Sequence, residues 1–251
     1  MNSSRAYEGM APAVADVEAL ALTALATLWR HLDRMLPLWF ALAAFHALTH
    51  AATQSQGVDT PVLQQIFANE ASTMTNLAVS ALASGIGLRI FLGRGREALR
   101  PSGDLGGYVS IVVLLAVAPT VMLMGLHPPG FDTSRAQLVA EAPRLAVGLA
   151  TCVAAFWVSL RLTLWPIARL LDDRRVTGAQ SWTLMRGAVG RYAGAVILLV
   201  APMTLVNYLI GLLAAHASPL IHEAATAPLR AAMTLAATAV AAEVYRKRMG
   251  L

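Results

Sequence analysis

A chain of 251 residues that is 57% hydrophobic and only 13% charged differs from ordinary soluble domains, which carry about 25% charged residues. A soluble globule of this length leaves most of its residues in contact with water, so it could not hide so much apolar surface. The composition therefore excludes a soluble enzyme and a disordered chain, and it predicts an all-α, polytopic membrane protein. The formal net charge of +5 suits a protein that faces anionic lipid on one side.

The first 34 residues are expected to form a cytoplasmic tail and an amphipathic helix. The apolar stretch 19–28 does not resemble a cleaved signal peptide, because Asp16 and Glu18 lie where basic residues are expected and no small-residue cleavage site follows. Apolar residues recur instead at helical spacing and form a stripe along one helix face, from which Thr27 is excluded. The residues of this stripe are Val14, Val17, Ala21, Leu25 and Leu28. This pattern predicts a helix that lies along the membrane interface and leads into the first span.

Six windows are close to the roughly 20 mostly apolar residues that a spanning helix needs. In chain order they cover residues 35–53, 72–92, 107–126, 145–171, 192–214 and 225–245. Pro37 is typical of a helix start, whereas Arg161 and Pro166 interrupt the fourth window. The prediction is one integral membrane domain over residues 1–251. It comprises a six-span bundle at 35–245, a short cytoplasmic tail at 246–251, and interfacial amphipathic helices before the first and fifth spans.

The basic residues orient this bundle. Cytoplasmic segments of membrane proteins are enriched in Arg and Lys, and 16 of the 19 basic residues fall in alternate connections that include both ends of the chain. The three exceptions are Arg135, Arg144 and Arg230. Both termini are therefore predicted to be cytoplasmic. All five tryptophans also fall toward that side, as in an interfacial aromatic belt.

Small residues predict which helices pack closely. In the last window, Ala232 and Ala236, then Ala237 and Ala241, are four residues apart, a spacing that allows close helix approach. The patch 83–87 in the second window is also rich in small residues and could allow close helix approach. The sixth helix is therefore expected to be central in the bundle.

Arg161 is the most unusual charged residue, because its window places it within or near the hydrocarbon, where an unpaired charge is costly. It either snorkels toward the cytoplasm or pairs with an acid, and Glu243 is the natural partner by depth. A contact with a substrate or a lipid phosphate is the functional alternative.

Histidines collect toward the opposite side. His46 and His50 are separated by one helical turn, a usable half of a metal site. The remaining candidate ligands are His127, His216 and His222. These would have to converge from separate connections, so no metal and no cofactor are predicted, and the histidines are interpreted as interfacial polar residues. The lone Cys152 excludes a disulfide framework and a multi-thiolate metal site.

Known catalytic patterns are missing from the sequence. No Gly-x-Ser-x-Gly elbow occurs, and no serine is evidently coupled to histidine and aspartate. Nucleic-acid binding is disfavoured, because the basic residues follow the membrane topology and do not gather on one soluble face. The chain is therefore predicted not to be an enzyme.

The most informative motif lies between the fourth and fifth windows. It reads RLTLWP at 161–166, DDRR at 172–175 and TGAQSWTLMRG at 177–187. This segment resembles the membrane domain attached to some bacterial glycerophosphoryl diester phosphodiesterases, and related stand-alone six-helix membrane proteins. The matching positions are Arg161, Leu162, Leu164, Ser181, Trp182, Leu184, Arg186 and Gly187. The resemblance implies a multi-pass protein of the bacterial inner membrane. No catalytic domain and no His-Arg-Gly phosphodiesterase signature are present, so that activity is not carried over.

The motif also has a physical interpretation. Trp182, Met185 and Val189 are expected to share a face in the headgroup layer, and Gly187 and Gly190 would let the chain bend into the fifth span. The arginines that could meet lipid phosphates there are Arg175, Arg186 and Arg191. The segment is thus either a structural elbow or a recognition site for an anionic headgroup or partner.

These observations predict a non-enzymatic membrane subunit that binds a partner or organises lipids. Its expected partners are anionic lipid headgroups at the cytoplasmic face, with a membrane protein or a second copy of the chain as a further possibility. The candidate binding residues are Arg161, Arg175, Ser181, Trp182, Arg186 and Glu243. The alternative is a small transporter or lipid-handling protein with a polar path around Arg161 and Glu243.

Overall fold

The computed structural model describes residues 4–54, 62–93, 97–126, 135–213 and 219–251, and within these ranges the regular structure is entirely helical. The helices are α1 (Ser4–Arg30), α2 (Leu32–Gln54), α3 (Val62–Phe91), α4 (Gly103–Leu126), α5 (Arg135–Leu162), α6 (Leu164–Leu170), α7 (Gly178–Leu184), α8 (Val189–Leu213) and α9 (Pro219–Met249). The predicted all-α class is confirmed for this part of the chain.

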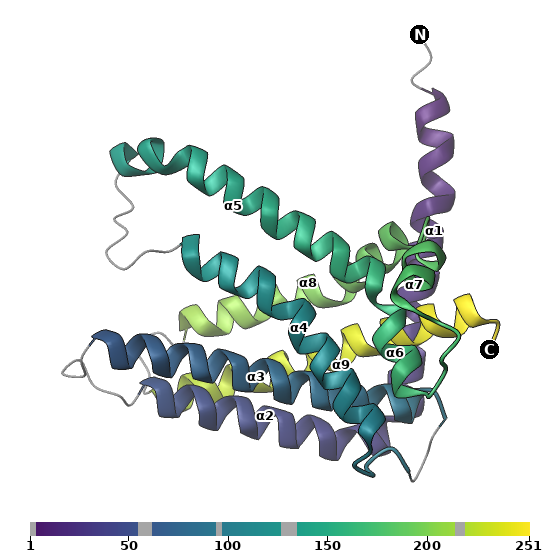
Figure 1. The fold of residues 1–251 in the computed structure, drawn as a ribbon, viewed down its shortest axis with the longest axis horizontal. Coiled ribbons are helices and arrows are strands. Elements are labelled where there is room, and N and C mark those ends of the chain that lie inside the picture. Colours follow the sequence, from purple (N-terminus) through teal and green to yellow (C-terminus); the bar gives the residue numbers. More distant parts are fainter. Residues whose placement is uncertain (1–3, 55–61, 94–96, 127–134, 214–218) are drawn as a thin grey trace.

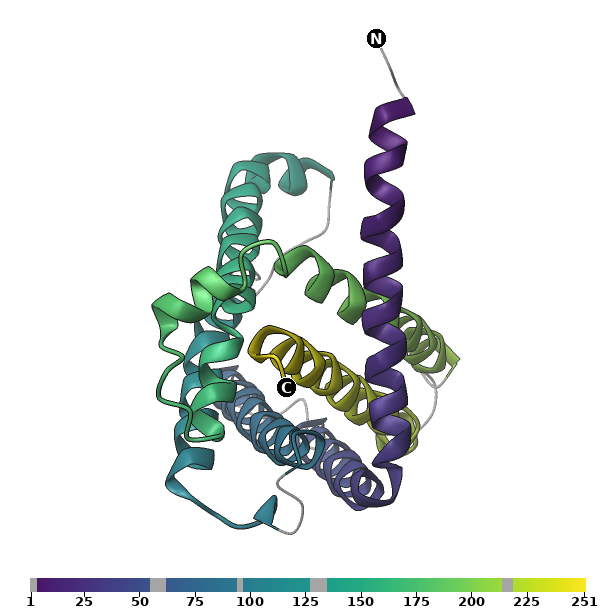
Figure 2. The same cartoon turned by 90° about the vertical axis from the view of Figure 1, so that its right-hand side faces the viewer.

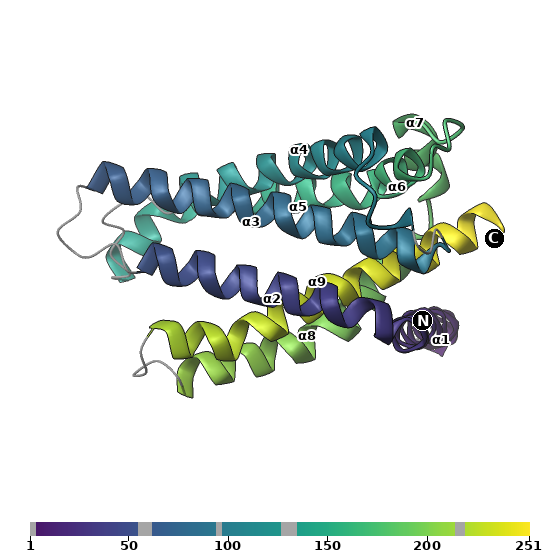
Figure 3. The ribbon, with the colours of Figure 1, turned by 90° about the horizontal axis from the view of Figure 1, so that it is seen from below.

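Six long helices form an elongated bundle, and the shorter or transverse elements gather at one end of it (Figure 1). Figure 3 shows α1 and the C-terminus at this same end. The end is made of the helix termini and connections at residues 27–35, 89–93, 97–105, 160–192 and 243–251, and we call it the basic end because the described arginines and Lys247 concentrate there. The other ends of α2, α3, α4, α5, α8 and α9 lie at the opposite end of the bundle (Figure 1).

Each of the six predicted windows coincides with one long helix or, for the fourth, with a helix pair. Within the described residues, three helices are long and apolar enough to cross a membrane: Ser72–Phe91, Val189–Leu213 and Ile221–Met249. The pair Leu149–Leu162 and Leu164–Leu170 would make a fourth span if its members count as one. The structure thus supports a membrane protein with at least three candidate spans.

Two helix boundaries differ from the predictions. Pro37 does not start the first span, because α2 begins at Leu32 and Pro37 lies inside it. The fourth window is not one continuous helix, since the chain bends by 41° between α5 and α6. Pro166 contributes to this break, because a proline lacks the N–H that would bond to the preceding turn.

Helix α9 is the central element of the bundle, as predicted from its small residues. It packs against α1, α2, α3, α6 and α8, and Figure 2 shows it surrounded by the other helices. Its buried residues are mostly small: Ala227, Ala231, Ala236, Ala239, Val240, Ala241, Ala242 and Val244. Such side chains allow neighbouring helix backbones to approach closely and increase van der Waals contact.

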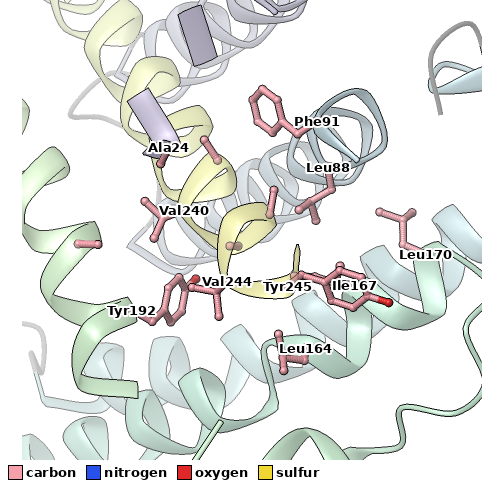
Figure 4. Close-up of a cluster of buried hydrophobic side chains, with 14 of the residues drawn as sticks. Ala24, Leu88, Phe91, Leu164, Ile167, Leu170, Tyr192, Val240, Val244 and Tyr245 are labelled. Carbon is pink, nitrogen blue, oxygen red and sulfur yellow. The ribbon is translucent and has the colours of Figure 1, made fainter. Parts of the chain in front are cut away.

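The main core lies where α9 reaches the basic end (Figure 4). Val240, Val244 and Tyr245 of α9 contribute to it, together with Ala24 of α1 and Tyr192 of α8. The residues added by α3 and α6 are Leu88, Phe91, Leu164, Ile167 and Leu170. Segments more than 200 residues apart in sequence therefore share one apolar cluster, which fixes the elements of the basic end relative to one another.

Helix α1 lies across the basic end, transverse to the long helices (Figures 1 and 2). Its contacts are with α9, α8 and α2. Leu20, Ala21 and Ala24 are buried on this side, which agrees with part of the predicted stripe. Thr27, placed off the stripe by the periodicity, is also buried, whereas Leu25 is exposed. The buried face is therefore rotated from the expected one, and it includes Thr27, whose hydroxyl donates to Glu243 of α9 at 2.6 Å.

The glycines of the predicted 83–87 patch are sites of close helix approach. A Cβ added at Gly85 would lie 2.7 Å from Leu105 Cδ1 and 3.0 Å from Tyr108 Cδ1, both on α4. A Cβ at Gly87 would lie 3.3 Å from atoms of Met35 and Thr238. The absence of a side chain at Gly85 therefore sets how closely α3 and α4 can pack.

Gly85→Val should destabilise the bundle by about 1–3 kcal/mol, the usual cost of overpacking a well-packed contact. Thermal unfolding in detergent provides the measurement. Gly107→Val on α4 is the matched control, because a Cβ there has no atom within 4 Å of it. Equal losses in the two variants would contradict the close packing of α3 on α4.

Candidate functional site at the basic end of the bundle

The segment that carries the sequence motif forms a compact elbow between α5 and α8. Its first part is the α5–α6 break, where the Thr163 hydroxyl donates to the Ser159 carbonyl at 3.1 Å. Helix α6 then turns back into the core, with Leu164, Ile167 and Leu170 buried. The chain leaves α6 through the connection 171–177, which leads to α7.

The connection is held by local and long-range polar contacts. Asp172 adopts a positive φ of 57°, a left-handed conformation that aspartate tolerates better than most residues. The Asp173 N–H donates to the Ala168 carbonyl at 2.8 Å, which ends α6. Asp173 Oδ1 accepts from the backbone N–H and the guanidinium of Arg175, both at 3.1 Å. Tyr245 of α9 points its hydroxyl at the same carboxylate from 3.5 Å.

These contacts decide the charge state of Asp173. Partial burial alone would raise the pKa of its carboxyl, but the hydrogen bonds and charge of Arg175 and the Tyr245 hydroxyl hold that pKa below its ordinary value. The carboxylate therefore remains ionised at neutral pH and ties the connection to α9.

Helix α7 begins with a capping box that sequence inspection overlooked. The Gln180 N–H donates to Thr177 Oγ1 at 3.3 Å, and the Thr177 N–H donates to Gln180 Oε1 at 2.8 Å. A Thr followed three residues later by Gln is a readable sequence signal for such a start. This cap allows a helix of only seven residues to present Ser181 and Trp182 to α5.

Arg161 lies between two indole rings. Its Cζ atom is 5.4 Å from the ring centroid of Trp157 on α5 and 5.1 Å from that of Trp182 on α7. Its Nη1 donates to the Trp182 carbonyl at 3.0 Å, and the Ser181 hydroxyl donates to the Arg161 carbonyl at 3.0 Å. A planar guanidinium can stack on aromatic faces while it donates hydrogen bonds from its edge. Arg161 therefore fastens α7 to the end of α5.

Glu243 is not the partner of Arg161. Its Oε1 accepts hydrogen bonds from the Thr27 hydroxyl at 2.6 Å and from Arg246 Nη1 at 2.5 Å. These partners lie on α1 and on α9 itself, and Glu243 is only 8% exposed. The expected pairing failed because similar depth along the bundle does not imply that α5 and α9 face each other at that level.

The other predicted site residues separate into buried and accessible groups. Ser181 is fully buried and has a supporting role, and Arg175 is bound to Asp173. Trp182 is partly exposed. Arg186 is exposed, and the described residues offer it no ion-pair partner. The structure thus brings Arg161, Ser181 and Trp182 together, but it does not bring Arg175, Arg186 or Glu243 into the same contact.

The predicted shared face of Trp182, Met185 and Val189 is wrong. Met185 and Val189 are buried in the core, whereas the Trp182 ring is partly exposed and contacts Arg161. The reason is that the helix does not continue beyond Leu184. Gly187 has a φ of 77° and turns the chain as predicted, while Gly190 lies within α8 without an unusual φ.

Two arginines make structural contacts at the basic end, one with the last carbonyl of α3 and one with the connection between α3 and α4. Arg246 donates to the Phe91 carbonyl, and Arg89 donates to the Arg100 carbonyl at 2.8 Å and to the Ser102 hydroxyl. Carbonyls at a helix C-terminus lack intrahelical donors and carry partial negative charge. Part of the basic composition is therefore structural.

The remaining described cations of the basic end differ in their pairing. Arg191 pairs with Asp16 of α1 at 2.8 Å, and Arg174 lies 3.5 Å from Asp172. Cations with no ion-pair partner among the described residues are Arg30, Arg169, Arg186, Lys247 and Arg248. A cavity of about 220 Å³ between α1, α8 and α9 has Asp16, Arg191, Lys247 and Arg248 as its charged lining residues. The basic end therefore has an excess of positive charge over the acids around it.

Arg230, an exception to the predicted charge distribution, lies in the middle of α9. It donates to Glu223 and, at 2.9 Å, to the Thr226 hydroxyl. Glu223 is only 1% exposed. A buried charge requires such compensation, so the pair explains how an arginine is accommodated away from the basic end.

The candidate metal ligands do not form a described cluster. His46 Nδ1 lies 3.2 Å from Asn76 Oδ1 and joins α2 to α3, and His222 Nε2 lies 4.0 Å from Glu223 Oε1. Among the side chains that the structure describes, no three His, Cys, Asp or Glu residues could together hold a metal. His127 and His216 lie outside the described residues, as does the side chain of His50.

Comparison with protein-family models, with characterised proteins and with solved structures found no match for this chain. The resemblance of segment 161–187 to the phosphodiesterase-associated membrane domain therefore stays a prediction that rests on its motif residues.

Arg161→Lys should loosen α7 and the 171–177 connection, because an ammonium cannot stack between two rings and donate in the same fixed plane. The expected cost is about 1–2 kcal/mol, the range of a partly desolvated cation–π contact. Hydrogen–deuterium exchange of residues 171–187 in detergent would report it. Arg169→Lys, at an exposed position on α6, serves as the control, and similar exchange in both variants would argue against the fastening role.

Arg175→Ala should destabilise the protein at neutral pH but not at strongly acidic pH. Because the pKa of Asp173 is lower in the folded chain than its ordinary value of 3.8, its contribution to stability is present above that value. The contribution is lost as the pH falls through the folded-state pKa. Unfolding free energies measured as a function of pH should therefore converge in acid. Arg174→Ala, which removes only an exposed pair with Asp172, should show no such pH-dependent difference.

Proposed function

We propose that this chain is a non-enzymatic, six-span protein of the bacterial inner membrane that binds anionic lipid headgroups at its cytoplasmic face. The basic end is this face, so both ends of the chain are cytoplasmic. Through this contact the protein organises lipids or holds a membrane partner. The resemblance of segment 161–187 to the membrane domain of some phosphodiesterases agrees with this proposal.

The position and exposed face of α1 carry the proposal. Leu22, Leu25 and Trp29 form an exposed apolar stripe on a helix that lies across the end of the bundle. The stripe continues into an apolar groove of about 330 Å³, whose other walls come from α2, α8 and α9. In water this surface would be unfavourable, whereas in the headgroup layer it would contact the upper parts of acyl chains.

The unpaired cations of the basic end supply the second half of such a contact. A basic residue near an anionic membrane surface contributes about 1 kcal/mol of attraction. Lys247 and Arg248 line the 220 Å³ cavity beside α1, and Arg186 follows the exposed Trp182. An amphipathic helix beside unpaired cations is the usual combination for binding anionic lipid.

A transporter with a polar path around Arg161 and Glu243 has less support. Arg161 contacts Trp157 and Trp182, whereas Glu243 contacts Thr27 and Arg246. Each residue thus has a local structural partner, and neither needs the other.

The test is lipid selection by the purified protein. The protein is reconstituted into nanodiscs of mixed phosphatidylglycerol and phosphatidylethanolamine and then released from them in the mass spectrometer. Native mass spectrometry should show that the lipids that remain bound are preferentially phosphatidylglycerol. Lys247→Gln should weaken this retention about five-fold, as expected for the loss of about 1 kcal/mol.

Arg174→Gln provides the control, because Arg174 is equally basic but already paired with Asp172. Retention that is unselective in the parent protein, or that falls equally in both variants, would contradict headgroup binding at the basic end. A protein that carbonate washing releases from membranes would contradict the membrane-spanning proposal itself.

A further inference from the structure

A second cavity of the described structure lies among the long helices, near the basic end. Its volume is about 430 Å³, and α3, α4, α5, α6, α8 and α9 all contribute to its wall. No charged side chain lines it. It is separate from the basic cavity beside α1, and neither the motif nor the headgroup proposal accounts for it.

The wall of this cavity is more apolar than its residue types suggest. The Ser159 hydroxyl donates to the Ala155 carbonyl at 3.0 Å, and the Thr163 hydroxyl donates to the Ser159 carbonyl at 3.1 Å. The Thr238 hydroxyl donates to the Thr234 carbonyl at 2.7 Å, and its oxygen lies 3.1 Å from the Ser84 hydroxyl oxygen. A buried water needs two to four polar partners, and hydroxyls already engaged with their own helices supply few of them. The cavity therefore suits an apolar occupant better than a water cluster.

Tyr108 differs from the serine and threonine hydroxyls of the wall, which bond to their own helices. It lines the cavity and is 5% exposed, and its hydroxyl has no hydrogen-bond partner among the described residues. Buried tyrosine hydroxyls usually find a partner, and an unsatisfied donor costs about 1–3 kcal/mol. An occupant that offers one acceptor oxygen would remove this cost.

The cavity communicates with the lipid-facing surface of α5. Phe156 lines the cavity and is nevertheless 58% exposed, and its neighbours Val153 and Trp157 are exposed as well. In the proposed membrane, a molecule could therefore enter from the bilayer between α5 and α8. Tyr108 lies five residues after the start of α4, about 7 Å along the helix. That depth is close to the boundary between the headgroup layer and the hydrocarbon.

We propose that this cavity binds one acyl chain of a membrane glycerophospholipid, whose ester carbonyl accepts a hydrogen bond from the Tyr108 hydroxyl. Ester carbonyls lie beneath the headgroup, at the depth of Tyr108, and the chain beyond them is apolar like the wall. The inference rests on the proposed insertion in a bilayer, but it adds a site for a single lipid tail within the bundle.

The test uses phosphatidylglycerol that carries a photoreactive diazirine on one acyl chain, incorporated in nanodiscs with the full-length protein. After illumination, mass spectrometry should find label on the cavity-lining peptides of α4 and α5. Ala237→Phe places a ring in the cavity and should abolish this labelling. Ala201→Phe, at an exposed position on α8, should leave it unchanged.

A second pair of variants tests the hydrogen bond and remains informative if Ala237→Phe fails to fold. Tyr108→Phe should reduce the cavity label about five-fold, the value of one neutral hydrogen bond. Tyr208→Phe, exposed on α8, should not.

Equal cavity labelling in Tyr108→Phe and Tyr208→Phe would overturn the proposed hydrogen bond and with it the site. Label confined to outward-facing residues would also overturn the proposal. In either case a chain that resists carbonate extraction would still support membrane insertion, so the two proposals fail separately.

Discussion

An ionised guanidinium is costly to place in hydrocarbon, and the arrangement of this molecule follows from that cost. The described cations that lack a local acid lie at one end of the bundle, together with α1, α6, α7 and the C-terminus. Arg230 lies away from this end, and it is neutralised by Glu223 within the same helix. The basic end therefore combines structural cations, such as Arg246 at the end of α3, with cations that have no ion-pair partner among the described residues.

The central position of α9 makes this arrangement possible. Its alanines let α2, α3 and α8 approach closely, and at the basic end its larger residues Val240, Val244 and Tyr245 reach α1 and α6. Where α5 diverges from this packed core, a cavity remains, and Tyr108 is part of its wall. Close packing at α9 and looser packing at α5 thus divide the molecule into a stable scaffold and a candidate lipid site.

Sequence periodicity and charge predicted the long helices, the central α9 and the helix α1, because hydrophobic length and residue size act locally. Contacts between segments that are distant in sequence were harder to predict. Depth along the bundle suggested Glu243 as the partner of Arg161. Which faces of two helices are in contact depends on the rotation of each helix about its own axis, and a hydropathy pattern does not give that rotation. Trp182 was among the predicted binding residues, but its contact with Arg161 depends on how α7 folds back against the end of α5, which the sequence pattern does not show. The Tyr108 cavity left no sequence signal, since its wall comes from six separate elements.

A measurement of how deep α1 lies in the membrane is the most direct test of headgroup binding at the basic end. Leu22 and Thr23 are adjacent and both exposed, but they lie on different faces of α1. Spin labels at these two positions, in a background without Cys152, can be compared by power saturation in reconstituted bilayers. The account predicts that the label at 22 is accessible to oxygen and the label at 23 to a water-soluble nickel complex. Equal access of the nickel complex to both labels would mean that α1 stands away from the membrane, and would contradict the account.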